Sequence, residues 1–398
     1  MIIVEINAVI SGSTGNIMLN IAKYARANGH VVYTFAGLRR NEINPEWNIP
    51  INRWVNHYFH RFFGKLFGLN EHLSCLSTMR AIHRIKKIKP DLIHIHLLHG
   101  CYINYKILFS YLKKTTIPVV WTFHDCWAFT GRCPHFIQLR CGLWRSGCTN
   151  CKYSKKMYPQ SFFNVSRREW KNKKNAFTSI RQLTIVTPSK WLKTVVEKSF
   201  FSKYNSTVIN NGIDLTTFYP REKINKNNNY FYVLGVANIW NNKKGLDVFI
   251  KLAKLLPSNY RIMLVGTNIR IDEMLPENII SIHKTHNLDE LASIYSTADL
   301  FLNPTREDNF PTVNIESLAC GTPVLTSNVG GSAEIIDDTC GDVANFDDIE
   351  ETVKKIRFIC ECAPFSRNKC TERARLFDMN VKYNEYVKLF ESFQSNVD

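Results

Sequence analysis

The stretch IIVEINAVISGSTGNIMLNIAKYARANGHVVYTF, residues 2–35, predicts the kind of sheet on which the chain is built. An apolar run at residues 2–10 ends in the turn-forming residues 11–15, and residues 16–27 then carry apolar side chains at helical spacing. Gly29 and His30 end this helix, and residues 31–35 form a second apolar run. A strand, a helix and a strand in this order form a βαβ unit, which predicts parallel strands.

The same alternation continues along the chain. In the first half, we expect strands at residues 91–96, 117–123, 183–187 and 207–210, and a helix at residues 102–114. Turn-forming residues at 210–214 and a polar run at 223–229 then mark a hinge. Beyond it we expect strands at residues 230–237, 261–265, 299–303 and 323–327, and helices at residues 245–256, 289–296, 312–319 and, in the tail, 367–393.

This pattern predicts an α/β protein with two domains, each built on a parallel sheet. A chain of 398 residues is long enough for two domains that each bury a core. The expected division is an N-terminal domain at residues 1–211, a C-terminal domain at 212–375, and a helical tail at 376–398 that returns to the N-terminal domain. A cysteine-rich insertion at residues 131–151 belongs to the first domain.

The composition is that of a globular protein, with 45% hydrophobic and 12% aromatic residues. The net charge of +17 favours anionic partners: nucleotides, lipid pyrophosphates, an anionic membrane or nucleic acid. The first residues lack the basic segment of a signal peptide, and no later run reaches the roughly 20 apolar residues that a membrane crossing needs. We therefore expect a cytoplasmic protein.

Residues 304–324, PTREDNFPTVNIESLACGTPV, resemble the donor-site motif of glycosyltransferase family 4. Further motifs of that family occur in the family's order along nearly the whole chain: Gly29-His30, residues 91–96, Thr122-Phe123-His124, Asn211-Gly212-Ile213-Asp214, Lys244-Gly245 and Gly330-Gly331. The variants HDCW at residues 124–127 and EDNFP at 307–311 are similar to a branch found in bacterial capsule, exopolysaccharide, O-antigen and colanic-acid synthesis.

The resemblance implies the GT-B fold, in which two facing Rossmann-like domains hold the donor in the cleft between them. It also implies transfer with retention of anomeric configuration, and no cofactor or metal for catalysis. The donor would be a UDP- or GDP-sugar, and the acceptor a saccharide or a lipid-linked saccharide. Because the bond between the sugar and the diphosphate breaks, such an enzyme must stabilise negative charge on the leaving phosphate.

The resemblance places most catalytic and donor-binding residues in the second domain. Lys244 is expected to contact the diphosphate, and Glu316 the ribose hydroxyls, because a carboxylate accepts two hydrogen bonds from a vicinal diol. Asp308, the other acidic residue of the motif, is expected near the sugar. Family members carry an arginine where this chain has Asn238, so a neighbouring cation must replace it. The remaining donor-binding candidates are Lys243, Arg306, Glu307, Asn309, Phe310 and Thr312.

Pro311 stands where relatives commonly have glycine, and it removes one backbone N–H from the donor loop. The neighbouring residues Phe310 and Thr312 would then supply the backbone contacts to the donor, and Lys243 or Arg306 the second cation.

The first domain contributes a glycine-rich turn and a histidine. Gly12 and Gly15 are expected to let the backbone approach the diphosphate closely, because glycine has no side chain. His124, at the end of a predicted strand, matches the family histidine that contacts the donor sugar, and strand ends are where such sheets bind ligands. Asp125 is expected to orient His124 or to contact the acceptor.

Four cysteines lie in the insertion, which is otherwise rich in glycine and polar residues and has few apolar residues for a core: Cys133, Cys141, Cys148 and Cys151. Four thiolates can surround a structural zinc ion. Reduced thiols, transient disulfides and an iron–sulfur cluster are the alternatives. Because the insertion follows His124 closely, we expect it to cap the acceptor side, whatever holds it together.

Two other features allow two interpretations each. Residues 53–67 interleave basic and aromatic side chains, which is typical of a helix at a membrane interface and also of a helix that packs its aromatic rings into the core. His94 and His96 alternate on a predicted strand, and buried structural roles are favoured over ligand contacts.

Two competing functions remain open at this point. A nucleotide-sugar epimerase of the same fold would use the donor without an acceptor. A non-catalytic basic scaffold would bind a membrane or nucleic acid through its charge, although the sequence contains no recognisable nucleic-acid module. No specific nucleic-acid partner is therefore expected.

Overall fold

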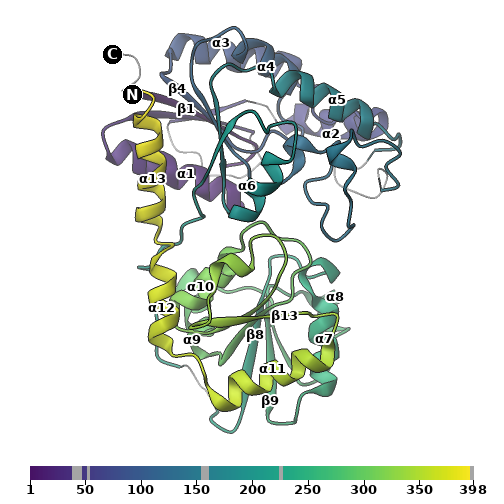
Figure 1. The fold of residues 1–398 in the computed structure, drawn as a ribbon, viewed down its shortest axis with the longest axis vertical. Coiled ribbons are helices and arrows are strands. Elements are labelled where there is room, and N and C mark those ends of the chain that lie inside the picture. The colour runs from purple at the N-terminus through teal and green to yellow at the C-terminus, as the bar shows by residue number, and fades with distance from the viewer. Residues whose placement is uncertain (38–46, 52–53, 154–160, 224–226, 395–398) are drawn as a thin grey trace. The chain divides into compact units, whose positions relative to one another are not determined.

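The computed structural model describes residues 1–37, 47–51, 54–153, 161–223 and 227–394. The chain divides into two compact units, Met1–Ile209 with Tyr383–Asp398, and Asn210–Lys382. Each unit is built on one parallel sheet with helices on both faces (Figure 1). The predicted α/β class with two Rossmann-like sheets is confirmed.

The first unit has a seven-stranded sheet in the order β3-β2-β1-β4-β5-β6-β7. Its strands are β1 (Ile2–Asn7), β2 (Val31–Ala36), β3 (Asn48–Pro50), β4 (Leu92–Ile95), β5 (Val119–Thr122), β6 (Leu183–Thr187) and β7 (Asn205–Val208). Its helices are α1 (Gly12–Ala27), α2 (Trp54–Phe67), α3 (Cys75–Ile88), α4 (Tyr105–Leu112), α5 (Ser166–Phe177) and α6 (Lys190–Glu197), with the short 3-10 helices η1 (Trp127–Phe129) and η2 (Leu143–Arg145).

The two faces of this sheet differ in character. Val4 and Ile6 of β1 join Ile93 and Ile95 of β4 in the main core, together with apolar residues of α3, α4 and α5. Because side chains alternate along a strand, the residues between them point to the opposite face. That face contacts α1, and it also contacts the last helix of the chain, α13 (Met379–Glu391), from which aromatic rings approach β4.

The second unit has a six-stranded sheet in the order β10-β9-β8-β11-β12-β13. Its strands are β8 (Phe231–Val236), β9 (Tyr260–Val265), β10 (Ile279–Ile282), β11 (Leu300–Asn303), β12 (Val324–Ser327) and β13 (Gly341–Ala344). Its helices are α7 (Leu246–Leu255), α8 (Ile269–Asp272), α9 (Leu288–Thr297), α10 (Thr312–Ala319), α11 (Ile349–Cys362) and α12 (Arg367–Arg375), with the 3-10 helices η3 (Asn242–Lys244) and η4 (Ala333–Ile335).

Separate apolar clusters form on the two faces of the second sheet. Helices α7 and α11 cover one face, where Phe249 and Ile356 are fully buried. Helices α9, α10 and α12 cover the other, where Tyr295, Ile315 and Ala374 are fully buried (Figure 1). With both faces covered, the strands are almost continuously apolar, as expected for a parallel sheet.

Candidate active site

The predicted donor residues lie on two loops of the second unit. Strand β8 lies between β9 and β11, so the order of the strands reverses at the β8–β11 pair. In open parallel sheets, ligands bind at the carboxyl ends of the strands where this reversal occurs. Residues 237–245 follow β8 and residues 304–311 follow β11. The sequence motif therefore falls at the position where this fold binds ligands.

Ion pairs join these two loops. The Nζ atom of Lys244 lies 2.8 Å from Oδ2 of Asp308. Its neighbour Lys243 lies 2.8 Å from Oε2 of Glu307, whose side chain is almost entirely buried. The two adjacent lysines of one loop thus pair with the two adjacent carboxylates of the other.

Arg306 makes a third connection, which joins its loop to α7. Its guanidinium donates two hydrogen bonds to the carboxylate of Asp247 on α7, at 2.7 and 2.8 Å, and its backbone N–H donates to the carbonyl oxygen of Lys243. The side chain of Arg306 therefore fastens the loop to α7. Asn238, where relatives have an arginine, is exposed in the loop after β8. Of the two candidates for the second cation, Arg306 thus pairs with Asp247 and Lys243 with Glu307.

The close contact between the loops depends on Gly245. This residue has φ +75° at the start of α7, and a Cβ atom there would lie 2.4 Å from Cγ of Pro304. No side chain fits at that distance, and the left-handed backbone conformation is one that glycine adopts without strain. The Lys-Gly pair of the sequence motif therefore has a structural reason besides its charge.

The backbone of the donor loop is partly engaged within the protein. The N–H of Phe310 donates to Oδ1 of Asp308 at 3.3 Å, its carbonyl oxygen accepts a hydrogen bond from Asn211, and its ring is buried in the core. Asn309 is also buried. Thr312 is the first residue of α10, and the first N–H groups of a helix have no partner inside the helix. Of the two predicted backbone contacts, Thr312 is the better placed for an anion.

Glu316 lies half-buried on α10, and its position depends on a residue that the sequence reasoning missed. The hydroxyl of Tyr295, a fully buried residue of α9, donates to Oε2 of Glu316 at 3.1 Å. Burial raises the pKa of Glu316, and hydrogen bonds from Tyr295 and Thr312 oppose this effect. Nothing in the local sequence distinguishes Tyr295 from an ordinary core residue on a helix.

In the first unit, the two predicted glycines have different surroundings. Gly12 is exposed at the start of α1. Gly15 is buried, and a Cβ atom there would lie 2.5 Å from the carbonyl carbon of Ile10. Gly15 therefore lets α1 pack tightly against the loop that follows β1.

His124 and Asp125 follow β5 and are each half-buried. Nε2 of His124 lies 2.9 Å from Nδ1 of His96, and the two rings are stacked. Oδ2 of Asp125 lies 2.7 Å from Nε2 of His99. Burial alone would raise the pKa of Asp125, but the interactions with His99 outweigh it and lower the pKa below its usual value. Asp125 is thus a charged residue paired with His99, and the ring of His124 contacts the ring of His96.

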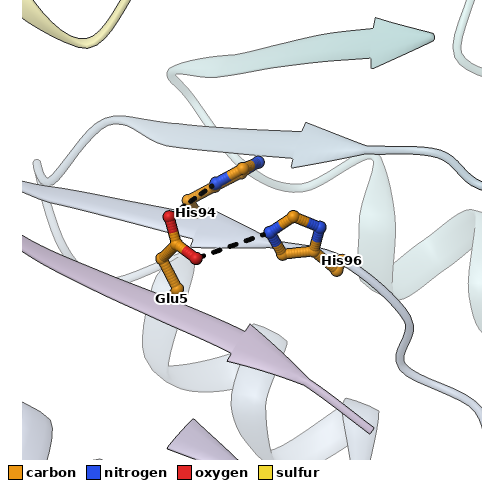
Figure 2. A group of neighbouring side chains, drawn as sticks. All are labelled: Glu5, His94 and His96. Atoms are coloured by element: carbon orange, nitrogen blue, oxygen red, sulfur yellow. Dashed lines mark hydrogen bonds and ion pairs between the residues drawn. The ribbon is translucent and has the colours of Figure 1, made fainter. Parts of the chain in front are cut away.

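His94 and His96 are fully buried, in agreement with the favoured interpretation. Figure 2 shows that both rings lie beside the carboxyl group of Glu5 on the adjacent strand β1. Among the described residues, these three form the one group of His, Cys, Asp and Glu side chains with ligand atoms close enough to hold a metal ion. Sequence spacing could not reveal Glu5, because the strands that bring it to His94 are far apart in the chain.

A buried lysine anchors the start of the cysteine-rich insertion. Nζ of Lys173 donates to the carbonyl oxygens of Trp127 at 2.8 Å and Thr130 at 3.3 Å, and it lies 3.5 Å from the centre of the Trp127 ring. Burial lowers the pKa of Lys173 to about 8, although nearby carboxylates raise it. One of these, Glu169, accepts a hydrogen bond from Nε2 of His72 at 2.8 Å.

Two residues of the insertion, which has few apolar residues for a core of its own, pack into the main core of the first unit. Trp144 is 3% exposed and belongs, with Cys148, to the main core of the unit, because the loop folds back over η1 and α5. The indole N–H of Trp170 donates to the carbonyl oxygen of Trp144 at 2.7 Å. Apolar packing thus helps to hold this loop, and it does not depend on cysteine chemistry alone.

The four cysteines of the insertion are free thiols in this structure. Burial, together with the neighbouring thiols, raises the pKa of Cys133 to about 12. The sulfur of Cys148 accepts a hydrogen bond from the N–H of Gly131 at 3.1 Å. The other three thiols all act on the pKa of Cys133, but the four sulfurs do not meet the spacing found for Glu5 and its two histidines. The zinc site stays a prediction.

Helix α2 carries a patch of exposed aromatic rings, which we call the aromatic patch: Tyr58, Phe59, Phe62, Phe63 and Phe67. Four of these side chains are 50–66% exposed, and Phe63, which stacks between Phe59 and Phe67, is 37% exposed. Arg61 and Lys65 are exposed on the same helix. Packing into the core is therefore wrong for these rings. Arg53 lies outside the described residues, as does the side chain of Trp54.

None of the helices in the described parts of the chain is both long and apolar enough to cross a bilayer.

The whole chain is similar to sucrose-phosphate synthase from Thermosynechococcus elongatus, with a TM-score of 0.72, 16% identity and 99% of each chain covered. The two Rossmann-like units, each with its own parallel sheet, define the GT-B class of glycosyltransferases.

Comparison with protein families gives a narrower assignment. The model described as Glycosyltransferase Family 4 matches residues 14–217, and the model described as Glycosyl transferases group 1 matches residues 219–377. The first covers more than half of the chain, and the chain therefore belongs to glycosyltransferase family 4.

Two curated relatives illustrate the range of the family. The putative colanic acid biosynthesis glycosyl transferase WcaC of Escherichia coli K12 is 21% identical over 277 residues, which is 67% of this chain and 66% of the relative. The chain thus spans just under two thirds of that protein's length. The alpha-monoglucosyldiacylglycerol synthase of Acholeplasma laidlawii is 23% identical over 344 residues, covering 80% of this chain and 77% of the relative.

Proposed function

We propose that the protein is a retaining glycosyltransferase that moves a sugar from a UDP- or GDP-sugar to a saccharide or lipid-linked saccharide, in the synthesis of a bacterial surface polysaccharide. The observation that carries the proposal is the meeting of Lys244 and Asp308 at the reversal point of the second sheet, directly before α10. The name of the E. coli relative supports this class of polymer.

The chemistry requires stabilisation of a leaving phosphate. The bond between the anomeric carbon and the phosphate oxygen breaks, and a bond to the acceptor oxygen forms on the same face of the sugar. Lys244 supplies a cation for the phosphate, and the first N–H groups of α10, beginning with Thr312, supply hydrogen bonds. The proton of the acceptor hydroxyl passes to the leaving phosphate oxygen. The reaction balances without a protein nucleophile or a catalytic metal.

The ion pairs between the loops prepare this site for an anion. Lys244 is neutralised by Asp308 while no donor is bound, and both side chains are partly exposed. Such a pair contributes about 1 kcal/mol or less, so a diphosphate displaces Asp308 at little cost. The released carboxylate of Asp308 then binds hydroxyls of the donor sugar. Lys243 stays with the buried Glu307 and adds positive charge nearby.

The other predicted residues take roles that match their surroundings. Glu316, held by Tyr295, binds the ribose hydroxyls of the nucleotide. His124 contacts the donor sugar, and the charged Asp125 lies on the acceptor side. An epimerase would need the same nucleotide contacts but no acceptor, and a basic scaffold would need neither.

Nucleotide binding to the purified chain tests the proposal. UDP or GDP should raise the melting temperature, because a ligand that binds only the folded state stabilises it by mass action. Lys244→Ala should reduce this shift, whereas Lys254→Ala, an exposed lysine on α7, should not. A chain that neither nucleotide stabilises, or a Lys244→Ala variant that is stabilised equally, would reject this assignment of the donor site.

We propose further that the aromatic patch on α2 binds an anionic membrane surface on the cytoplasmic side. Exposed Phe59 and Phe62 insert into the headgroup region, while Arg61 and Lys65 are attracted to anionic lipids. A lipid-linked acceptor would be presented at that surface. The observation that favours this partner is the exposure of aromatic rings beside basic side chains on a protein of net charge +17.

A further inference from the structure

A line of buried polar groups leads to His124 through the first unit. Glu5 and His94 are register partners on β1 and β4, and His96 lies two residues further on, directly after the end of β4. Their exposed fractions are 0%, 0% and 1%. Oε1 of Glu5 lies 3.4 Å from Nδ1 of His94, and Oε2 lies 3.7 Å from Nε2 of His96 (Figure 2).

The line continues at both ends. On one side, Nδ1 of His96 lies 2.9 Å from Nε2 of the half-buried His124. On the other, Nε2 of His94 lies 2.8 Å from the hydroxyl of Thr122, which lies 3.2 Å from the hydroxyl of Tyr386 on α13. The result is a single file of six groups, which we call the polar chain: Tyr386, Thr122, His94, Glu5, His96 and His124.

Burial favours the uncharged form of the carboxyl and imidazole groups of the polar chain. Burial raises the pKa of Glu5, which favours the protonated carboxyl group, and His96 opposes this shift. Burial lowers the pKa of His94 and His96 to about 3 each, and that of His124 to about 4. The charged groups nearest the outer end are Asp125 and its partner His99, which act on His124 in opposite directions.

Neutral groups in single file can orient their hydrogens in only two consistent ways. In the outward arrangement, Tyr386 donates to Thr122, Thr122 to His94, His94 to Glu5, Glu5 to His96 and His96 to His124. His124 then accepts at Nε2 and carries its proton on Nδ1. In the inward arrangement every donor becomes an acceptor, and His124 carries its proton on Nε2.

The buried end of the polar chain decides between the two arrangements. Tyr386 is 3% exposed. Among the described residues, its hydroxyl forms a hydrogen bond with the hydroxyl of Thr122. The inward arrangement would leave the hydroxyl hydrogen of Tyr386 without an acceptor in the interior, which costs the desolvation of that group. The outward arrangement satisfies it. Neighbouring hydrogen bonds in a chain polarise and reinforce one another.

The same arrangement explains two orphaned atoms. Oε2 of Glu5 and Nε2 of His96 face each other without a hydrogen-bond partner, at a separation slightly longer than a hydrogen bond. With a proton on Oε2, the carboxyl group of Glu5 is a donor and Nε2 of His96 is the acceptor that it faces. A divalent ion held by Glu5, His94 and His96 would instead leave a net positive charge in the interior, because one carboxylate balances only half of it.

We propose that the polar chain holds His124 in the Nδ1–H tautomer, so that its outer nitrogen is a hydrogen-bond donor. Glu5, His94, His96 and Tyr386 are then positioning residues, and the C-terminal helix α13 controls a group at the end of β5. That His124 directs this hydrogen bond to the donor sugar rests on the proposed function.

Nuclear magnetic resonance of protein labelled with ¹⁵N-histidine reads the tautomer without any substrate. The His124 signals are identified by their loss in His124→Gln. We expect the Nδ1–H form of His124 to exceed the other by about tenfold or more, which corresponds to about 1.4 kcal/mol. Tyr386→Phe removes the terminal donor and should bring the ratio close to one. Tyr383→Phe, on the same helix and equally buried, should leave it unchanged.

Substitution at Glu5 separates this role from simple packing. Glu5→Gln can still donate to His96 and accept from His94, so it should keep the tautomer, whereas Glu5→Leu should lose it. An Nε2–H tautomer in the parent protein, or an unchanged ratio in Tyr386→Phe, would overturn the proposal. So would about one transition-metal ion per chain that Glu5→Gln abolishes. The expected tautomer in a protein that transfers no sugar would contradict the proposed function alone.

Discussion

Replacing Glu316 by alanine should weaken nucleotide binding, and the structure shows that it also has a stability cost. Loss of a hydrogen bond to a charged group is worth about 1.5–3 kcal/mol, which corresponds to a roughly 10- to 150-fold higher dissociation constant for the nucleotide. Glu316 is half-buried in the second unit. The nucleotide affinities of the parent and the variant can therefore be compared only if the variant is folded.

The stability cost comes from Tyr295. Its hydroxyl is fully buried and donates to Glu316, so Glu316→Ala leaves a buried donor without its acceptor. This costs about 1–3 kcal/mol of unfolding free energy. The double variant Tyr295→Phe, Glu316→Ala removes both partners and should recover most of that stability while binding nucleotide as weakly as Glu316→Ala. Tyr295→Phe alone should weaken binding less, because the carboxylate remains.

Isothermal titration calorimetry with UDP and GDP measures the affinity, and urea unfolding measures the stability, of the parent and the three variants. If Glu316 binds the ribose, the double variant should regain the stability of the parent protein but not its affinity for the nucleotide. A double variant that binds nucleotide like the parent would refute the ribose contact. Equal losses of stability and affinity in all three variants would show that Glu316 is only structural.

Three further predictions concern the first unit. Replacing Phe59 and Phe62 by serine should weaken binding to anionic vesicles by at least about tenfold, because each ring that is buried in the membrane contributes about 1.5–3 kcal/mol. The melting temperature of the protein should change little. Vesicle binding that is unchanged by the substitutions and insensitive to salt would reject the membrane role. Elemental analysis should find about one zinc ion per chain, and this zinc should be lost when Cys148 and Cys151 are both replaced by serine. Full activity of the metal-free, reduced protein would reject a loop that is held by zinc. Glu5→Gln should stabilise the fold increasingly as the pH rises above about 4.5, as scanning calorimetry from pH 5 to 9 can show.

The sign of the last prediction follows from the pKa of Glu5. Burial raises that pKa, so the folded chain keeps a proton that the unfolded chain loses near its usual value of 4.5. Stability therefore falls as the pH rises through this window, and glutamine removes the loss. The lowered pKa of His94 and His96 acts in the opposite sense: stability falls as the pH drops below 6.5 towards 3, in the parent and the variant alike. A parent and variant with parallel pH profiles would contradict the buried neutral carboxyl.

Much of the fold could be predicted because its strands are short apolar runs between turn residues. The first βαβ unit and the strands on either side of the donor motif follow from this local pattern. Strands β3, β10 and β13 were missed. β3 has three residues, β10 follows a proline-containing turn, and β13 (GDVA) is half polar, so none has a distinctive local pattern.

The candidate site residues could be predicted only where they lie in motifs of the family. Lys244 and Asp308 were found because the family places them at fixed positions, and the structure brings them together as an ion pair. Tyr295 and Glu5 were missed, because their importance arises from contacts across helices and strands. Glu5 meets His94 through the register of two strands 89 residues apart, which no local spacing encodes.

A proton NMR time course of the purified chain with UDP- and GDP-sugars, in the presence and absence of saccharide and lipid-linked acceptors, distinguishes retaining sugar transfer from the competing reactions. We expect nucleotide to appear only when an acceptor is present, and the anomeric coupling of the new glycoside to match that of the donor. Conversion of the donor to an epimer without acceptor, an inverted anomeric configuration in the product, or no consumption of any donor would contradict this expectation.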